Sequence, residues 1–268
     1  MGSAAKKFDD ASKPNNPSRV VVLGCPVDNL TMDETVRLAV AAMRNGRPVR
    51  QVSLNVAKLV NMRSDPLLRS DVTTSDIINA DGAGILLAGR ITGSRLKERV
   101  AGIDLFQNLL KVCAEQNFRP FFLGATPDVL REAVSNAVKR NPSLRLAGAR
   151  DGYFTREQEP QLLTEINASG ADCLFIGMPT PRKERWLAAN KDSLKIPFAM
   201  GVGGSFDILA GRVQRAPRLF QERGLEWLYR VMQEPRRMWW RYTRTNFLFA
   251  GILCLAVVRN LRRRGASY

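Results

Sequence analysis

The chain has 268 residues, of which 45% are hydrophobic, so it can bury a substantial core. It contains no histidine, which excludes Ser-His-Asp and Cys-His mechanisms and metal sites of the His-Glu-x-x-His type. Its 41 basic and 25 acidic residues give a net charge of +16, which indicates nucleic acid, anionic lipid or a diphosphate substrate as partner.

Residues 1–18 are polar and lack the apolar stretch of a signal peptide, so we expect a flexible leader and a cytoplasmic protein. The four cysteines are scattered and form no Cys-x-x-Cys pair, which argues against a zinc site or a disulfide framework.

From residue 19 onward, short β-rich runs alternate with helical patterns. The pattern predicts an α/β fold in residues 19–217: a Rossmann-like, mostly parallel sheet flanked by helices. The predicted strands are 19–24, 49–55, 76–80, 119–125, 144–149, 171–178 and 196–204, and the helices between them are 31–46, 57–63, 84–90, 104–116, 127–140, 156–170 and 181–191.

Ligands bind beyond the carboxyl ends of the strands in such sheets, so the residues that follow each strand are candidates for a site. Taken singly, each stretch also suits an ordinary turn or helix cap. The stretches are rich in glycine and polar residues: Ser53 and Asn55, 79–84, 124–127, 177–181 and 201–207.

Asp81 directly follows a predicted strand and precedes two glycines and a helix. It either caps that helix or reaches into the cleft as a base, because histidine is absent. Arg99 lies beyond the helix and either returns to the cleft to bind a diphosphate or forms an exposed salt bridge.

The segment GVGGSFD, residues 201–207, fits neither the G-x-G-x-x-G fingerprint nor the Walker P-loop. Its glycines can present N–H groups to an anion, and Asp207 can accept hydrogen bonds from a ribose or base. The chain has no Asp-x-Asp motif, so we expect no metal and no cofactor.

Residues 218–268 are predicted to form a helical, basic, membrane-associating appendage. From Arg212 to the end there are 13 arginines, no lysine and 3 glutamates, a net charge of +10. The apolar run 247–258 is too short to span a bilayer, and a longer window includes Arg241 and Arg244. An interfacial helix is favoured, and a helix that completes the core or a dimer contact is the alternative.

Several motifs occur together in the order seen in WecG/TagA/CpsF glycosyltransferases, and the resemblance covers roughly residues 20–245. They are VSLNVAKL, NADGAG, KERVAGIDL, DGYF, GMPTPRKERW, GVGGSFDILAGRVQRAP and GLEWLYRVMQEPRRMWWRY. The resemblance implies an inverting, metal-independent transfer from a UDP-sugar to a polyprenyl-diphosphate-linked sugar, for polysaccharide precursors of the cell envelope, peripherally at the cytoplasmic face of the inner membrane.

The resemblance also implies roles for residues of this chain. Asp81 matches the catalytic base, Ser53 stands where Thr is common, and Arg99 matches a cleft arginine. The implied nucleotide-sugar site comprises Asn55, Tyr153, Lys183, Glu184, Gly201, Gly203, Gly204 and Asp207, and the implied acceptor-diphosphate site comprises Arg230, Arg237 and Arg241.

Two positions depart from the family pattern. Lys183 stands where many members have Gln, and Trp240 precedes Arg241 where an Arg-Arg pair is frequent. The donor sugar, the acceptor sugar and the oligomeric state therefore stay open. The alternative function is a basic nucleic-acid- or anionic-lipid-binding protein without catalysis. A nicotinamide-dependent oxidoreductase is disfavoured, because LGCPVDN offers only Gly24 for the required fingerprint.

Overall fold

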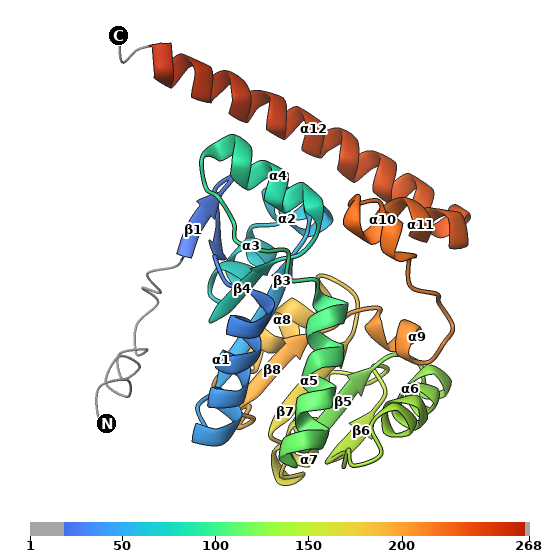
Figure 1. Ribbon diagram of the computed structural model, residues 1–268. Coiled ribbons are helices and arrows are strands. Elements are labelled where there is room, and N and C mark those ends of the chain that lie inside the picture. Colours follow the sequence, from blue (N-terminus) through green and yellow to red (C-terminus); the bar gives the residue numbers. More distant parts are fainter. Residues whose placement is uncertain (1–18, 266–268) are drawn as a thin grey trace, which may run out of the picture.

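The computed structural model describes residues 19–265, so the predicted leader 1–18 lies outside the described residues. The centre of the molecule is a six-stranded parallel sheet in the order β4-β3-β8-β7-β5-β6 (Figure 1). The predicted α/β fold with a parallel sheet is confirmed. The strands are β3 (Val49–Leu54), β4 (Ile77–Ala80), β5 (Pro120–Gly124), β6 (Gly148–Arg150), β7 (Cys173–Gly177) and β8 (Phe198–Gly201).

Helices cover both faces of the sheet, because its strands carry apolar side chains on both sides. One buried cluster joins the sheet to α1 (Met32–Asn45), α5 (Gly102–Gln116), α6 (Pro127–Arg140) and α9 (Ser205–Leu209). A second joins the opposite face to α7 (Glu159–Ala168) and α8 (Arg182–Ala189). A third lies around β3 and β4 and includes α2 (Val56–Ser64), α3 (Pro66–Thr73) and α4 (Ala83–Thr92).

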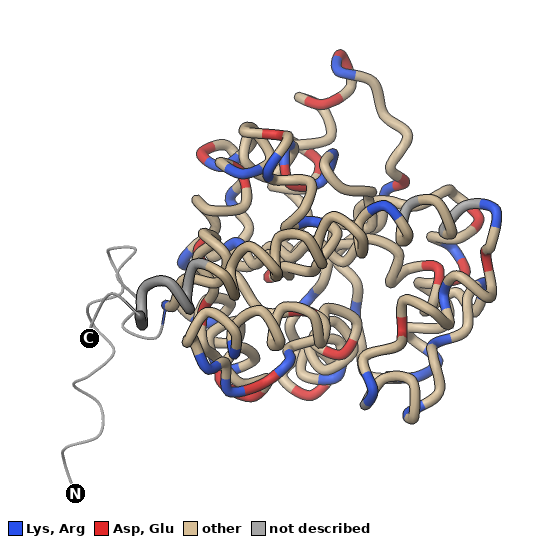
Figure 2. Tube along the Cα trace, turned by 90° about the horizontal axis from the view of Figure 1, so that it is seen from above, with Lys and Arg blue, Asp and Glu red and all other residues tan. Residues whose placement is uncertain are grey.

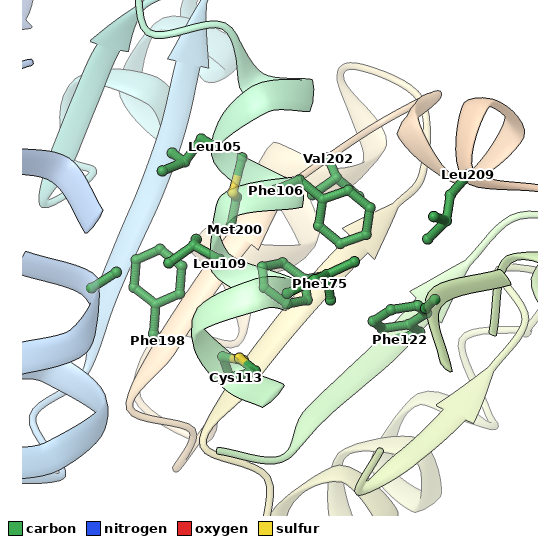
Figure 3. Close-up of a cluster of buried hydrophobic side chains, with 14 of the residues drawn as sticks. Leu105, Phe106, Leu109, Cys113, Phe122, Phe175, Phe198, Met200, Val202 and Leu209 are labelled. Atoms are coloured by element: carbon green, nitrogen blue, oxygen red, sulfur yellow. The ribbon is translucent and has the colours of Figure 1, made fainter. Parts of the chain in front are cut away.

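The first of these clusters contains an aromatic group that packs against the loop after β8, and Figure 3 shows Phe106, Phe122 and Phe175 of this group. The rings of Phe106 and Phe175 meet edge to face with centroids 4.9 Å apart, and those of Phe122 and Phe206 stack at 5.0 Å. All four side chains are fully buried. Phe206 belongs to the GVGGSFD segment, so the aromatic core holds that segment against the end of the sheet.

The predicted first strand is not part of the parallel sheet. Residues Arg19–Val22 form β1, which pairs antiparallel with β2 (Cys25–Asp28) in a separate hairpin. Leu23 and Gly24 have φ angles of 51° and 81°, as a two-residue hairpin turn requires. Leu is rarely found with positive φ, so the sequence did not reveal this turn. Asp28 accepts the backbone N–H of Ile78 and thereby docks the hairpin on β4.

The chain after residue 217 is helical, as predicted, in α10 (Arg218–Glu222), α11 (Glu226–Gln233) and α12 (Pro235–Gly265). Helix α12 packs on α2, α4 and α11 and crosses the top of the molecule (Figure 1). Its inner face buries Thr245 and Phe249. Within residues 19–265, no helix combines the length and the hydrophobicity that crossing a membrane requires.

Gly177 at the end of β7 offers a test of how tightly the loop after β8 is packed. A Cβ atom there would lie 2.3 Å from Cδ2 of Phe206, so we expect Gly177→Ala to lower the free energy of unfolding by about 1–3 kcal/mol. Chemical denaturation measures this loss. Gly251→Ala on α12 is the control, because a Cβ there meets nothing within 4 Å and the helix gains stability. An unchanged denaturation midpoint for Gly177→Ala would contradict the tight packing.

Candidate active site

A cleft of about 1580 Å³ lies between the carboxyl ends of β3, β4, β7 and β8 and the C-terminal helices. The topology explains this position, because the carboxyl ends of parallel strands meet at one edge of the sheet. Ten of the residues predicted from sequence line the cleft: Ser53, Asn55, Asp81, Arg99, Lys183, Gly201, Gly203, Gly204, Asp207 and Arg230.

Asp81 lies at the floor of the cleft, where β4 ends. Its backbone N–H donates to the carbonyl of Leu54 at 2.8 Å, which ties it to β3. The N-cap residue of α4 is Gly82 and no side chain caps the helix, so Asp81 does not cap the helix that follows it. Its carboxylate instead lies beside the backbone N–H of Gly102, the first residue of α5, and this N–H lowers the pKa of Asp81.

Glycine is required at position 102 because Ser53 and Asp81 lie too close to leave room for a side chain. A Cβ atom there would lie 3.0 Å from Oγ of Ser53 and 3.5 Å from Oδ2 of Asp81. The absence of a side chain therefore lets the N-terminus of α5 reach both groups. The partial positive charge of that helix end favours a carboxylate.

Burial raises the pKa of Asp81, and so does the nearby carboxylate of Glu226. The N–H of Gly102 and the positive charges of Arg99 and Lys58 lower it, and together these effects place the pKa at about 6. A carboxylate with this pKa is mostly ionised at neutral pH and still accepts a proton readily. Asp81 is therefore suited to act as a general base.

Ser53 is held from below by a buried polar network that the sequence did not indicate. Gln51 Nε2 donates to Ser53 Oγ at 3.3 Å and to Asn79 Oδ1 at 2.8 Å. Asn79 Nδ2 in turn donates to Thr35 Oγ1 on α1 at 2.9 Å. The available signal was the polar residues Gln51 and Asn79 within two neighbouring strands, since buried polar groups are normally hydrogen-bonded.

Lys183 lines the cleft, whereas Glu184 lies behind it. Both Lys58 and Lys183 place Nζ within 2.9 Å of Glu184 Oε1. Burial alone would raise the pKa of Glu184, but the two ammonium groups outweigh it and hold this pKa at about 2. Lys58 Nζ also donates to the carbonyl of Ser53 at 2.6 Å. Sequence reasoning missed Lys58, which joins this ion cluster to the floor of the cleft.

The glycine loop, residues 201–204, lets other groups approach closely. A Cβ atom on Gly201 would lie 2.9 Å from Cδ of Lys183, so the lysine stem lies flat against this residue. The N–H groups of Val202 and Gly203 both donate to the carbonyl of Ile176. These two groups are thus used within the protein, and the expectation that the loop offers its N–H groups to an anion is not supported at these positions.

Arginine side chains form the opposite wall. Arg230 of α11 lines the cleft near Gly204 and pairs with Glu234 at 3.0 Å. Arg99 lines it too and pairs with Glu226 of α11 at 3.1 Å. Arg99 thus reaches the cleft, and its salt bridge is mostly shielded from solvent rather than exposed as the second sequence-based alternative expected.

The remaining predicted residues do not line the cleft or cannot be placed. Tyr153 is 73% exposed and is not among the lining residues. Arg237 and Arg241 belong to α12, and their side chains lie outside the described part of the chain. No group of three or more His, Cys, Asp or Glu side chains suited to a metal ion occurs within the described residues.

The fold and the cleft can be compared with known protein families. The family model described as glycosyl transferase WecG/TagA/CpsF matches residues 20–264. The match therefore includes the sheet, every residue that lines the cleft, and the C-terminal helices α10, α11 and most of α12.

The raised pKa of Asp81 predicts a cost in stability. This cost grows as the pH rises from the ordinary pKa of 3.8 to the folded-state pKa of about 6, and it is absent below about pH 3, where the group is protonated in both states. Asp81→Asn should thus raise the free energy of unfolding by up to about 3 kcal/mol at pH 7.5 and leave it unchanged near pH 3. Urea unfolding at both pH values measures this difference.

Asp76→Asn is the matched control, because Asp76 precedes the same strand but lies at its opposite, solvent-exposed end in a pair with Arg50. We expect changes within about 1 kcal/mol for this variant at both pH values. An Asp81→Asn protein that is less stable than the wild type at pH 7.5 would contradict the assigned cost.

Proposed function

The chain belongs to the WecG/TagA/CpsF family of glycosyltransferases, which act in cell-surface polysaccharide synthesis, and on this premise we propose its reaction. It transfers a sugar from a UDP-sugar, with inversion and without a metal ion, to a polyprenyl-diphosphate-linked sugar. The observation that carries the proposal is the Asp81 carboxylate, which has a pKa of about 6 and lies in a cleft lined by cationic side chains.

In this reaction Asp81 takes the proton from the acceptor hydroxyl as the hydroxyl oxygen attacks the anomeric carbon of the donor. The bond between that carbon and the diphosphate breaks, and its electron pair leaves with UDP. A single displacement inverts the configuration of the anomeric carbon. The hydroxyl of Ser53, which lies beside Asp81 below Gly102, helps to orient the acceptor.

The leaving diphosphate needs positive charge, which this chain supplies from side chains. Lys183 and Arg230 line the cleft on either side of the glycine loop, and Arg99 lies near Asp81. Cationic groups fixed in a partly buried cleft stabilise a departing anion without needing to reorganise. Asp207, which also lines the cleft, is proposed to contact the nucleotide.

The residues that line the cleft support a lipid-linked acceptor. Beyond the polar centre, apolar side chains from α4 and α12 continue its lining: Leu86, Leu87, Phe249 and Leu253. We assign the donor site and the base to residues 19–217, and the acceptor diphosphate and membrane contacts to residues 218–268. Arg237 and Arg241 remain proposed ligands of the acceptor diphosphate beside Arg230.

The outer face of α12 supports peripheral binding to the cytoplasmic face of the membrane. Trp240 is 76% exposed, Phe247 80% and Leu255 61%, on the side opposite Phe249. Figure 2, seen from above, shows the middle of α12 without charged residues, whereas the sequence has arginines in its N-terminal part, at positions 236, 237, 241 and 244. Aromatic and aliphatic side chains on one face of a helix, with arginines at its ends, suit an interfacial position.

The proposed reaction is tested by UDP release from a panel of UDP-sugars, with a sugar-diphospho-polyprenyl acceptor and EDTA present. We expect turnover in EDTA, a loss of about 10²–10⁴-fold for Asp81→Asn, and no loss for Asp76→Asn. In the wild type, kcat/KM should fall as the pH drops through about 6, because the base becomes protonated. Strict dependence on added metal, or full activity of Asp81→Asn, would contradict the mechanism.

Membrane binding is tested by flotation with vesicles of phosphatidylglycerol and phosphatidylcholine. Replacing both Phe247 and Leu255 by Ser should weaken binding about 10-fold or more, because two exposed apolar side chains no longer enter the interface. Leu67→Ser on α3 is the control, because Leu67 is equally exposed at 66% but lies on another helix. Unchanged flotation of the double variant, or binding to RNA instead of vesicles, would count against this surface.

A further inference from the structure

Glu226, the first residue of α11, enters the cleft from the C-terminal helices. The chain approaches the catalytic floor closely just before it. Gly224 has a φ angle of 70°, and a Cβ atom there would lie 2.4 Å from Cβ of Ala83, two residues after Asp81. This contact places the segment before α11 directly against the start of α4.

Within the described residues, the carboxylate of Glu226 pairs with one cation and has one buried oxygen. Oε2 lies 3.1 Å from Nη1 of Arg99, and both side chains are mostly shielded, with 31% and 21% exposure. Oε1 is buried and accepts no hydrogen bond from the described residues. This ion pair therefore differs from a solvated surface ion pair, which contributes little to stability.

The negative charge of Glu226 also acts on Asp81. The charged groups that act on Asp81 are Glu226 from α11, Arg99 from the segment before α5, and Lys58 from α2. Glu226 raises the pKa of Asp81, whereas Arg99 and Lys58 lower it. One helical turn after Glu226, Arg230 lies near Gly204 and pairs with Glu234.

We propose that Glu226 is a positioning residue of the catalytic centre: it holds Arg99 beside Asp81 and seats α11 so that Arg230 lies over the glycine loop. This inference rests on the proposed function, in which Asp81 is the base. The residue joins the two halves of the site, since the base comes from the sheet and Arg230 comes from the appendage. It also keeps the proton affinity of Asp81 high.

The test compares Glu226→Gln and Glu226→Asp with the wild type in kcat/KM over pH 5–9, using UDP release as readout. We expect about a 10-fold or larger loss for Glu226→Gln, because Arg99 and α11 lose a charge-assisted contact. The acidic limb of its pH profile should move to lower pH, because Asp81 loses a neighbouring negative charge. Glu226→Asp keeps the charge, so its limb should return toward that of the wild type.

Glu132→Gln is the matched control. It removes a carboxylate that pairs with Arg212 and so also joins the body to the segment after α9, but neither residue lines the cleft. Its activity and pH profile should match those of the wild type. Thermal unfolding of each variant shows whether it is folded.

Three results would overturn the inference: wild-type kinetics for Glu226→Gln, higher activity than the wild type, or a loss of activity with an unmoved acidic limb. Higher activity would mean that Glu226 blocks Arg99 rather than positioning it. Asp81→Asn, measured in parallel, separates this inference from the proposed function. If Asp81→Asn is inactive and Glu226→Gln behaves as the wild type, the result supports Asp81 as the base and contradicts only the role proposed for Glu226.

Discussion

The close approach of Gly102 to the carboxylate of Asp81 links three parts of the site. It joins the end of β4 to the start of α5, and because Gly102 has no side chain, Ser53 is brought to the same point. The helix end lowers the pKa of a carboxylate that burial would otherwise raise further. The base can thus be partly buried and still be ionised at neutral pH.

Cations in the cleft are held by carboxylates of the protein. Arg99 pairs with Glu226, Arg230 with Glu234, and Lys58 and Lys183 share Glu184. Such pairs fix long side chains in place, so less conformational entropy is lost when an anionic ligand arrives. These carboxylates also offset part of the positive charge. The ordered cations of the cleft therefore repel one another less than they would without them.

The alternation of strands and helices could be predicted from the sequence. Parallel strands that are covered on both faces appear as short apolar runs, and these are easily told from the helical periodicity of the segments between them. It also placed Ser53, Asp81 and Asp207 at one cleft, because the carboxyl-end rule depends on topology alone. Contacts between distant segments were not predictable in this way. The turn at Leu23, the partnership of Lys58 with Glu184, and the use of the loop N–H groups by Ile176 all depend on tertiary packing.

The same limit applies to α12, where sequence offered an interfacial helix or a helix that completes the core. The inner face of α12 packs on the body of the protein, and the outer face is the one for which we propose the membrane contact. Phe249 is 8% exposed and contacts the α2 and α4 side, while Phe247, two residues earlier, is 80% exposed. A helical period separates these positions by about 200°, so one short apolar run serves both faces. Since Phe249 also lines the cleft, a helix that lies on a membrane by its outer face places its inner face where a lipid-linked acceptor would enter.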